Sequence, residues 1–452
     1  MEPWLERKVA EIEPLLDQGE PDAILAAVDG LHPADLAHLM EGLAEDEKRK
    51  LFALLDPGFA AEVLTELSEF SRDQVLEGIQ TRRLAEIVDD LPSDEATDII
   101  ADLPRKQAQE VLAHIDLEDS AEVRQLLQYP EDSAGGIMQL EMVSAYANQT
   151  VSETIESIRQ KRDEVGELHN VYVVDRERHL LGIVPLSNLI LADPGTVMRR
   201  VMEPCKLVVK AEEDQETVAQ KFRRYDVVSA PVVDEHKRLL GRITIDDVVD
   251  VLEEEASEDF MRMAGSSEED MFYSNQVFKI SGLRLPWLLT NLIGGLITGA
   301  LLWLFKGTLA DAIYLVSFVP VITGMGGNVG IQSSTIMVRG FALGRITVGG
   351  IWPVLWKELR VALVMGLVCG LVVGLVADLW HGKAVLGLVV GLAMLCGFSV
   401  AALMGTLAPA LFKRLNIDPA ISAGPFVTTA NDIVGILIYF TFATIFYRFL
   451  VT

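Results

Sequence analysis

The sequence predicts a multi-domain protein: an all-α cytoplasmic helical-repeat domain, a tandem α/β pair, an acidic connecting helix and a five-helix transmembrane domain. The chain has 452 residues, 50% of them hydrophobic, yet its formal net charge is -28. Residues 279–452 hold five acids and eleven Lys or Arg, which leaves 61 of the 66 acids and 27 of the 38 basic residues in 1–278. A strongly acidic soluble part therefore precedes an apolar part that is long enough for several membrane spans.

This charge limits the partners of the soluble part. A surface with so many acids argues against nucleic acid, whose phosphates need a basic surface, and favours multivalent cations. The three cysteines, Cys205, Cys369 and Cys396, have no CxxC or Cys/His spacing, which argues against a zinc site or a disulfide framework. The N-terminus shows no signal-peptide pattern, so we expect this part to stay in the cytoplasm.

Residues 1–130 are expected to form the helical domain. Apolar positions recur at three- and four-residue spacing from 5 to 128. A loose repeat of short segments, each entered through Pro or Ser, is visible at 31–36, 91–98 and 103–108. This pattern is typical of stacked helical hairpins, and taken alone it favours a protein-interaction scaffold.

Residues 131–250 contain one unit twice. Val171–Asp175 and Leu180–Pro185 are β-branched or apolar runs, and Ala230–Asp234 and Leu239–Thr244 repeat them about sixty residues later. Each pair is followed by a helical segment. The arrangement resembles a tandem pair of CBS domains, in which the Thr and Asp matching Thr244 and Asp247 can hold a nucleotide ribose.

The first copy has Ser187-Asn188 where the acid is usual. ATP binding at Thr244 and Asp247 and a purely structural dimerisation role therefore both stay open. Residues 251–278 continue as an acidic connecting helix and linker, with a helix over 247–262 and a break at Gly265-Ser-Ser267. Because this helix leads to the membrane part, it is placed to touch the entrance of a pore.

Residues 279–452 form the transmembrane domain. Five apolar segments are each long enough to cross a membrane, at about 285–305, 312–338, 359–377, 384–412 and 420–450. With a cytoplasmic N-terminus, eight Lys or Arg lie at inner ends and three at outer ends. This positive-inside bias predicts a multi-pass protein of the cell (inner) membrane with its C-terminus outside.

Two polar faces stand out in these segments. Gly324, Asn328 and Gln332 are spaced by four, and Thr428 and Asp432 are also four apart. A carboxylate at this depth costs roughly 3 kcal/mol on insertion scales, so Asp432 is expected to face a cation or a wet path as the only deep charge. Small residues and amides at a helix interface are the alternative explanation for the first face.

The order of parts, with Tyr129–Gly135, Gly326–Ser333 and Gly424–Asp432 as its most specific stretches, resembles the MgtE family of magnesium channels. The resemblance covers nearly the whole length. It implies a homodimer with the pore on the two-fold axis, transport of Mg²⁺, and closure when cytoplasmic Mg²⁺ binds between acidic domains. It implies a pore site of Asp432, Thr428, Gly424 and Asn328.

The resemblance also implies regulatory magnesium ligands in three regions. In the helical domain these are Glu62, Asp94 and Asp98; in the CBS region Glu216, Asp226, Asp247 and Asp250; and in the connecting helix Glu255, Glu258 and Asp259.

Other functions are weighed against this one. The first alternative is a secondary transporter of another divalent cation such as cobalt or manganese, which would use the same carboxylates. A membrane-anchored nucleotide sensor would not conduct. An intramembrane aspartyl protease needs two facing carboxylates, whereas each chain offers one deep Asp, so we expect no enzyme. The chain has no GxxxxGK[ST] motif for ATP hydrolysis.

Overall fold

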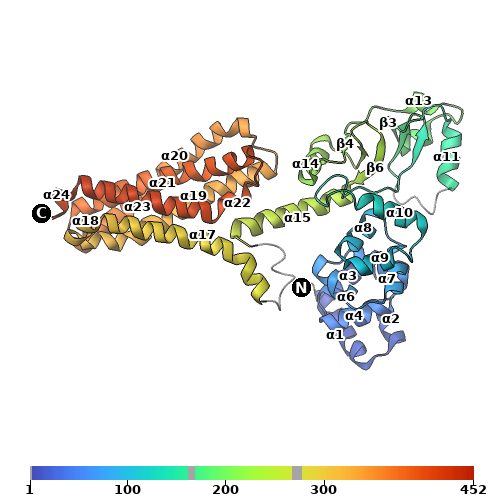
Figure 1. Ribbon diagram of the computed structural model, residues 1–452, viewed down its shortest axis with the longest axis horizontal. Coiled ribbons are helices and arrows are strands. Elements are labelled where there is room, and N and C mark those ends of the chain that lie inside the picture. The colour runs from blue at the N-terminus through green and yellow to red at the C-terminus, as the bar shows by residue number, and fades with distance from the viewer. Residues whose placement is uncertain (1–2, 161–167, 267–276, 452) are drawn as a thin grey trace. The chain divides into compact units, whose positions relative to one another are not determined.

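The computed structural model describes residues 3–160, 168–266 and 277–451 (Figure 1). The chain forms two compact units, Met1–Leu252 and Glu253–Thr452. The linker expected within 251–278 lies partly outside the described residues. The all-α, α/β and membrane parts expected from the sequence are all present.

The first part of the chain is a stack of short helices, as the repeat predicts. Proline occupies the first helical position of α2, α3 and α5, where its missing N–H is not needed. Helices pack against the second helix along the chain, as α3 does against α5 and α5 against α7. Buried Leu, Ile and Val from successive helices form one continuous core. The helices are α1 (Pro3–Gln18), α2 (Pro21–Val28), α3 (Pro33–Glu41), α4 (Glu45–Leu54), α5 (Pro57–Thr65), α6 (Glu69–Leu76), α7 (Thr81–Val88), α8 (Ser93–Asp102), α9 (Arg105–Val111) and α10 (Leu117–Leu126).

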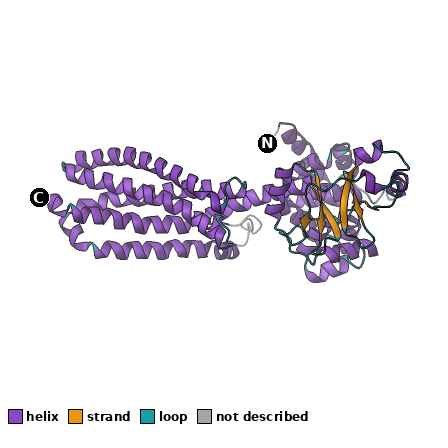
Figure 2. Cartoon of the chain, turned by 90° about the horizontal axis from the view of Figure 1, so that it is seen from above, coloured by secondary structure: helices purple, strands orange, loops and turns teal. Residues whose placement is uncertain are grey.

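Two small three-stranded sheets follow, with the same topology (Figure 2). In each, the first strand pairs parallel to the second, and the second pairs antiparallel to the third. The register shifts at the equivalent place in both, Val173/Val174 and Val232/Val233. The elements are β1 (Ser144–Tyr146), α11 (Val151–Gln160), β2 (Asn170–Val174), β3 (Leu180–Pro185), α12 (Leu186–Leu191), α13 (Met198–Val201), β4 (Val209–Lys210), α14 (Gln215–Tyr225), β5 (Ser229–Val233) and β6 (Leu239–Thr244).

The hairpin turns of the two sheets pair with each other. Leu180 donates its N–H to the Lys237 carbonyl at 3.0 Å, and Leu239 donates to the Arg178 carbonyl at 2.9 Å. Arg178 and Lys237 adopt the same left-handed conformation, with φ of 65° and 66°. The two copies therefore form one pseudo-symmetric pair, as expected for tandem CBS domains.

Helix α15 (Ile245–Ala264) begins directly after β6 in the first unit and ends in the second. It extends two residues beyond the predicted 247–262 at each end, and it stops at Gly265, which adopts the left-handed conformation.

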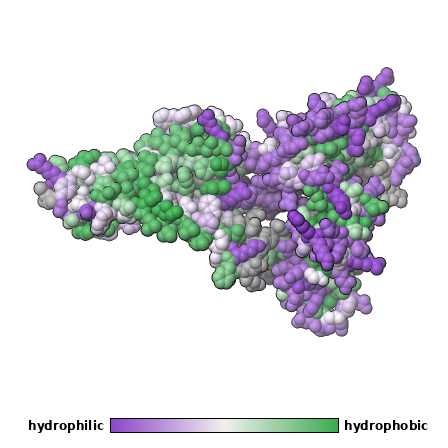
Figure 3. Space-filling model, viewed as in Figure 1, coloured by the Kyte–Doolittle hydropathy of each residue, from purple (hydrophilic) through white to green (hydrophobic). Residues whose placement is uncertain are grey.

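The second unit is a helical bundle, and the face of it seen in Figure 3 is largely apolar. Among the described residues, five stretches are long and apolar enough to cross a membrane: Val277–Leu304, Ile313–Ala342, Val348–His381, Ala384–Arg414 and Pro425–Ile445. The elements are α17 (Val277–Leu304), α18 (Lys306–Asp311), η1 (Ile313–Phe318), α19 (Val319–Ala342), η2 (Val348–Gly350), α20 (Ile351–His381), α21 (Ala384–Arg414), α22 (Ala420–Ala423), α23 (Pro425–Ile445) and α24 (Tyr447–Val451).

The helix ends differ from the hydropathy estimate in two places. Helix α17 begins at Val277 rather than near 285, because a helix continues through polar residues where nothing breaks it. The last apolar segment is divided at Gly424-Pro425 and again at Phe446, so α22, α23 and α24 are separate helices.

Glycines bring two of the spanning helices into close contact. A Cβ atom on Gly370 would lie 2.7 Å from the Gly391 carbonyl oxygen, and one on Gly374 would lie 2.7 Å from that of Gly387. Larger residues would therefore force α20 and α21 apart. Small residues at such contacts are the usual means of packing helices in lipid.

Candidate functional site

A cluster of carboxylates forms within the first unit, between the helical domain and the start of α15. Asp94, in the first turn of α8, is 6% exposed, and its Oδ1 atom is buried without a hydrogen-bond partner in the part of the chain that the structure describes. Burial raises the pKa of Asp94 well above its ordinary value, and the nearby charge of Asp247 raises it further. A buried carboxylate oxygen is costly unless a cation or a hydrogen-bond donor compensates it.

Three neighbouring acids share this environment. Burial and the charge of Asp98 raise the pKa of Glu95 to about 7. The pKa of Asp98 is also raised to about 7, by the surrounding protein and by Asp102, although its side chain reaches solvent. Burial raises the pKa of Asp247 to about 6, and Asp250 adds to that increase. A cation bound near these acids would remove the repulsion, and a hard cation prefers such oxygen ligands.

Hydrogen bonds orient the Asp247 carboxylate. Its Oδ2 atom accepts the Thr244 N–H at 3.0 Å and the Thr244 hydroxyl at 2.7 Å. Its Oδ1 atom accepts from Gln139 Nε2 at 3.3 Å. Thr244 and Asp247, the predicted nucleotide pair, are thus bonded to each other at the start of α15.

The structure brings together Asp94, Asp98, Asp247 and Asp250 of the regulatory ligands expected from the sequence. Glu62 lies on the exposed face of α5, and Glu216 lies on α14, where it accepts from Gln220 Nε2 at 3.2 Å. Asp226 follows α14 in the left-handed conformation, with φ of 51°. Ion binding by these three residues stays a prediction.

Several acids around the cluster were not among the ligands predicted from the sequence. Glu95 and Asp102 were not predicted. Glu95, Asp98 and Asp102 have i, i+3 and i+7 spacing, which places all three on one face of α8, so the sequence did contain a signal for them. Glu141, whose charge also raises the pKa of Asp94, gave no such signal.

A second acidic group on the helical domain was also missed. Asp89, Asp116 and Asp119 bring carboxylate oxygens within 4.8 Å of one another.

The last turn of α15 lies against the entrance of the membrane helices within the second unit. Arg262 forms ion pairs with Glu258 on its own helix and with Asp418 in the loop before α22. Met263 packs against Val338 of α19 and Ala420 of α22. A Cβ atom on Gly424 would lie 2.8 Å from the Met263 carbonyl oxygen.

Arg262 is held as a cation by this arrangement. Burial lowers its pKa, but the hydrogen bond and the charge of Asp418 outweigh burial, so the pKa is raised. Two of the predicted α15 ligands, Glu255 and Glu258, also raise it. Asp418 in turn accepts the Ala420 N–H at 2.7 Å, which ties the ion pair to the start of α22.

The candidate site in the membrane part lies on α23, the helix that follows α22. Asp432 is half-buried on α23, one turn after Thr428. The Gly424 carbonyl accepts both the N–H and the hydroxyl of Thr428 at 3.2 Å. A Cβ atom on Gly327 would lie 3.4 Å from Thr428 Cγ2, so Thr428 sits against the residue that precedes Asn328.

Asn431 was missed as the polar anchor of this helix. It is 4% exposed, and its Nδ2 atom donates to the Gly326 carbonyl at 3.5 Å. A Cβ atom on Gly330 would overlap the Asn431 side chain, so that glycine makes room for the anchor. On the opposite side of α19, Gly324, Asn328 and Gln332 are exposed on the single chain.

That Asp432 is the only deep charge stays a prediction, but a second acid is buried within the same helical bundle. Glu358 on α20 lies within a spanning stretch and is 5% exposed. It accepts the Ser333 hydroxyl of α19 at 3.0 Å and lies 3.7 Å from Lys357 Nζ. Hydropathy alone does not single out Glu358, because it does not show which side of a helix faces its neighbours.

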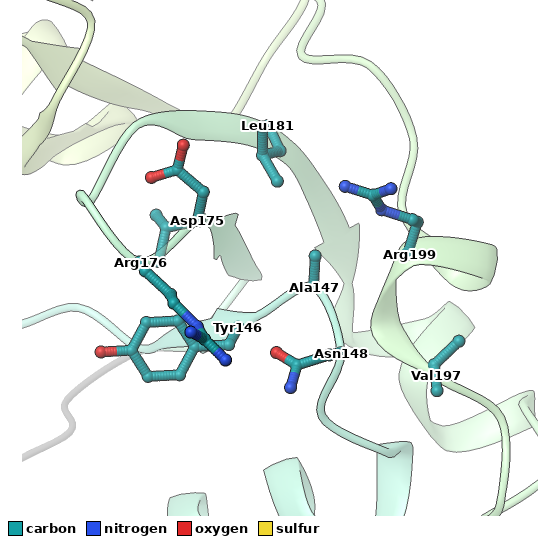
Figure 4. Close-up of a pocket in the computed structure, with 9 residues that line it drawn as sticks. Tyr146, Ala147, Asn148, Asp175, Arg176, Leu181, Val197 and Arg199 are labelled. Atoms are coloured by element: carbon teal, nitrogen blue, oxygen red, sulfur yellow. The ribbon is translucent and has the colours of Figure 1, made fainter.

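A separate surface cleft of about 390 Å³ lies on the first CBS copy (Figure 4). Arg176 and Arg199 line it together with Tyr146 and Asn148. Thr244 and Asp247 do not line this cleft, so it is distinct from the predicted nucleotide pair.

In the described residues, five stretches long enough to span a membrane, together with a carboxylate-rich domain, fit the class of divalent cation transporters. A family model described as a divalent cation transporter matches residues 319–442, and that of the MgtE intracellular N domain matches 31–132. The CBS domain model matches 134–195 and 197–254. The chain belongs to the MgtE family, and it is therefore a multi-pass membrane transporter rather than an enzyme.

Whole-length relatives support the same assignment. The magnesium transporter MgtE of Thermus thermophilus is 34% identical over 446 residues, covering 97% of this chain and 98% of the relative. That of Bacillus subtilis is 30% identical over 432 residues, covering 96% of each chain.

Two solved structures resemble the soluble part. The soluble part of a magnesium transporter is 30% identical with a TM-score of 0.50, covering 56% of this chain and 99% of that one. The cytosolic domain of the Mg²⁺ channel MgtE in complex with ATP is 33% identical with a TM-score of 0.51, covering 54% and 99%.

Proposed function

We propose that this protein is a homodimeric, magnesium-selective channel of the cell membrane, closed when cytoplasmic Mg²⁺ binds its acidic domains. The observation that carries the proposal is the course of α15. Its first turn holds Asp247 in the carboxylate cluster, and its last turn holds Met263 against Gly424 at the start of the pore helix. One helix thus links the regulatory acids to the transport path.

In the membrane, Asp432 supplies the charge and Gly424, Thr428 and Asn328 supply neutral oxygens. Mg²⁺ gives up water reluctantly and usually keeps several waters beside one or two carboxylates. A single Asp from each of two chains suits a hydrated ion better than a closed protein cage. The names of the 30–36% identical relatives favour magnesium over cobalt or manganese.

The exposed polar face of α19 supports the dimer. Asn328 and Gln332 would face lipid on a single chain, at a cost that a second copy or a water-filled path removes. A two-fold axis along this face would place two Asp432 carboxylates around one pore. With a cytoplasmic N-terminus, five spans leave the C-terminus outside.

In the first unit, Asp94, Asp98, Asp247 and Asp250 bind regulatory Mg²⁺ together. The ion binds more tightly to the state in which the acidic faces are close, and this difference in affinity closes the channel. The remaining regulatory ligands add weaker sites: Glu62, Glu216, Asp226, Glu255, Glu258 and Asp259.

ATP is a second ligand, held by the CBS pair through Thr244 and Asp247. The complex of a related cytosolic domain with ATP supports this assignment. Because Asp247 also belongs to the carboxylate cluster, ATP and Mg²⁺ binding are expected to influence each other.

The test is Mg²⁺ flux through the purified protein in liposomes, with the magnesium at the cytoplasmic face varied. We expect flux at low internal Mg²⁺, closure at high internal Mg²⁺, and loss of at least tenfold of the flux in Asp432→Asn. Asp311→Asn, the same change at an exposed position outside the predicted site, should conduct normally. Wild-type flux in Asp432→Asn would disprove the pore assignment.

A further inference from the structure

Ser93, the first residue of α8, connects the helical domain to the CBS pair through three hydrogen bonds. Its N–H donates to Glu141 Oε1 at 2.8 Å, and its hydroxyl donates to Glu141 Oε2 at 2.8 Å. The same hydroxyl oxygen accepts the Leu140 N–H at 2.9 Å. Ser93 is 3% exposed and Glu141 is partly exposed, so these bonds are partly shielded from water.

The residue before Ser93 explains why a partner from elsewhere is needed. The N-cap position of α8 is Pro92, which has no side-chain acceptor for the free N–H groups of the first turn. Glu141 supplies that acceptor from 48 residues away. Its negative charge also suits the positive end of the helix dipole.

The same short segment is fixed to the other side of the carboxylate cluster. Gln139 donates its N–H to the Arg242 carbonyl at 2.7 Å, and Arg242 donates back to the Gln139 carbonyl at 2.9 Å. Gln139 Nε2 also donates to Asp247 Oδ1 at 3.3 Å. A Cβ atom on Gly241 would lie 2.6 Å from the Gln139 carbonyl, so this close approach requires glycine.

Gln139–Glu141, which we name the strap, therefore bonds to α8 at one end and to β6 and Asp247 at the other. Desolvation of Asp94 and its repulsion by Asp247 oppose this junction, and the charge of Glu141 adds a smaller repulsion of its own. Hydrogen bonds that involve a charged partner and are partly shielded from water are strong enough to oppose this repulsion.

We propose that the strap, acting through Ser93 and Glu141, is the positioning element that preassembles the regulatory cation site and thereby sets the Mg²⁺ concentration at which it fills. This inference rests on the proposed regulatory function of the cluster. Ser93 and Glu141 need not contact the ion: they hold α8 and its acids opposite Asp247. A preassembled site binds more tightly, because the ion does not also have to bring the two domains together.

Ser93→Ala tests the proposal without changing any charge. Hydrogen exchange of the α8 and α15 amides is followed in the full-length protein in lipid nanodiscs while Mg²⁺ is titrated. We expect the Mg²⁺ midpoint for protection to rise roughly fivefold, because the variant loses the two hydrogen bonds of the Ser93 hydroxyl. Ser93→Thr keeps a hydroxyl and should restore a midpoint close to that of the wild type.

Ser120→Ala is the matched control. Ser120 is a buried hydroxyl of the same helical domain, and it donates to the Leu112 carbonyl at 2.8 Å without touching the strap. It should destabilise the domain to a similar extent and leave the Mg²⁺ midpoint unchanged. Exchange of the α3 and α5 amides without Mg²⁺ reports whether Ser93→Ala has kept its fold.

The outcomes separate this inference from the function on which it rests. A wild-type protein that shows Mg²⁺-dependent protection, with the same midpoint in Ser93→Ala, overturns the strap and leaves the regulatory site intact. A wild-type protein without Mg²⁺-dependent protection overturns the regulatory site itself. Equal midpoint shifts in Ser93→Ala and Ser120→Ala would show a general loss of stability and would also overturn the strap.

Discussion

At the scale of single residues, Asp94 combines conditions that an ionised carboxylate avoids. It is buried, Glu95 follows it on the same turn, and Asp247 faces it from another element. Raised carboxyl pKa values gather at functional sites, which makes this cluster the candidate site for a regulatory ligand. Because burial and neighbouring charges disfavour the ionised form of Asp94, we expect the stability of the Mg²⁺-free protein to depend on pH and to change when Asp94 is replaced by a neutral residue.

The first prediction concerns pH. Mg²⁺ binds ionised carboxylates, and the pKa values of Glu95 and Asp98 are both about 7 and that of Asp247 about 6. The Mg²⁺ midpoint for closure should therefore fall roughly tenfold or more as pH rises from 6 to 8, with protons released on binding. Flux in liposomes at fixed ionic strength measures it. A midpoint that does not move with pH would contradict the cluster as the regulatory site.

The same carboxylates set the sign of the stability change without Mg²⁺. These acids have ordinary pKa values near 4 in the unfolded state and values of about 7 in the folded state. At any pH between those two values, the folded state therefore binds more protons than the unfolded state. The melting temperature of the Mg²⁺-free protein should fall as pH rises from about 4 to about 7. Saturating Mg²⁺ should remove this decline, because the bound ion favours the ionised folded form.

The second prediction is that Asp94→Asn stabilises the Mg²⁺-free protein. The amide has nearly the same shape and removes the buried charge, so we expect a gain of about 1–3 kcal/mol in unfolding free energy. Thermal unfolding with and without Mg²⁺ measures it. The variant should also gain less stability from Mg²⁺ than the wild type. Asp17→Asn, at an exposed position on α1, should change neither quantity.

At the scale of elements, strands β3 and β6 could be predicted to the residue. Each is a six-residue apolar run bounded by a turn and a helix start. Strands β1 and β4 could not, because they have only three and two residues and form by pairing with β2 and β5. Short strands of this kind depend on tertiary contacts rather than on local preference.

The residues of the candidate site also fall into two groups, those that could be predicted from the sequence and those that could not. Asp94 and Asp247 could be named because their stretches resemble a known family. Gln139 and Glu141 could not, because their partners lie 108 and 48 residues away in the chain. The burial of Glu358 could not be predicted either, because which side of an apolar helix is buried depends on the neighbour against which it packs, here Ser333.

The third prediction belongs to helix α15. Arg262 joins Glu258 to Asp418, and Asp418 caps the start of α22. Arg262→Ala should loosen the last turn of α15 at the pore entrance and raise residual flux at high internal Mg²⁺. Because Arg262 is partly exposed, we expect no more than about a fivefold increase. Liposome flux at saturating Mg²⁺ measures it.

The control for this change is Arg159→Ala, which removes an exposed ion pair with Glu156 on α11. It should leave residual flux at the wild-type value. If Arg262→Ala also closes fully, the ion pair is not needed to hold α15 at the entrance, and Met263 packing alone must hold it.

At the scale of the whole molecule, charge is separated along the sequence. Nearly all acids precede residue 279, and the spanning part carries more basic than acidic residues. A high negative charge on the cytoplasmic part attracts divalent ions and makes their binding depend on ionic strength. The membrane part needs no energy source of its own if the ion moves down its electrochemical gradient.

The fourth prediction concerns movement of the ion down its electrochemical gradient, and it distinguishes a channel from an exchanger. A potential of 100 mV, negative inside, changes the free energy of a divalent ion by about 4.6 kcal/mol, equivalent to about three orders of magnitude in its concentration ratio. In liposomes with equal Mg²⁺ on both sides, a potassium diffusion potential alone should therefore drive Mg²⁺ entry through the wild-type protein. Liposomes that contain the Asp432→Asn variant measure the background entry of Mg²⁺. Entry that requires an opposing proton or sodium gradient, and fails with the potential alone, would identify coupled exchange and exclude the channel, because a conducting pore responds to the field on the ion itself.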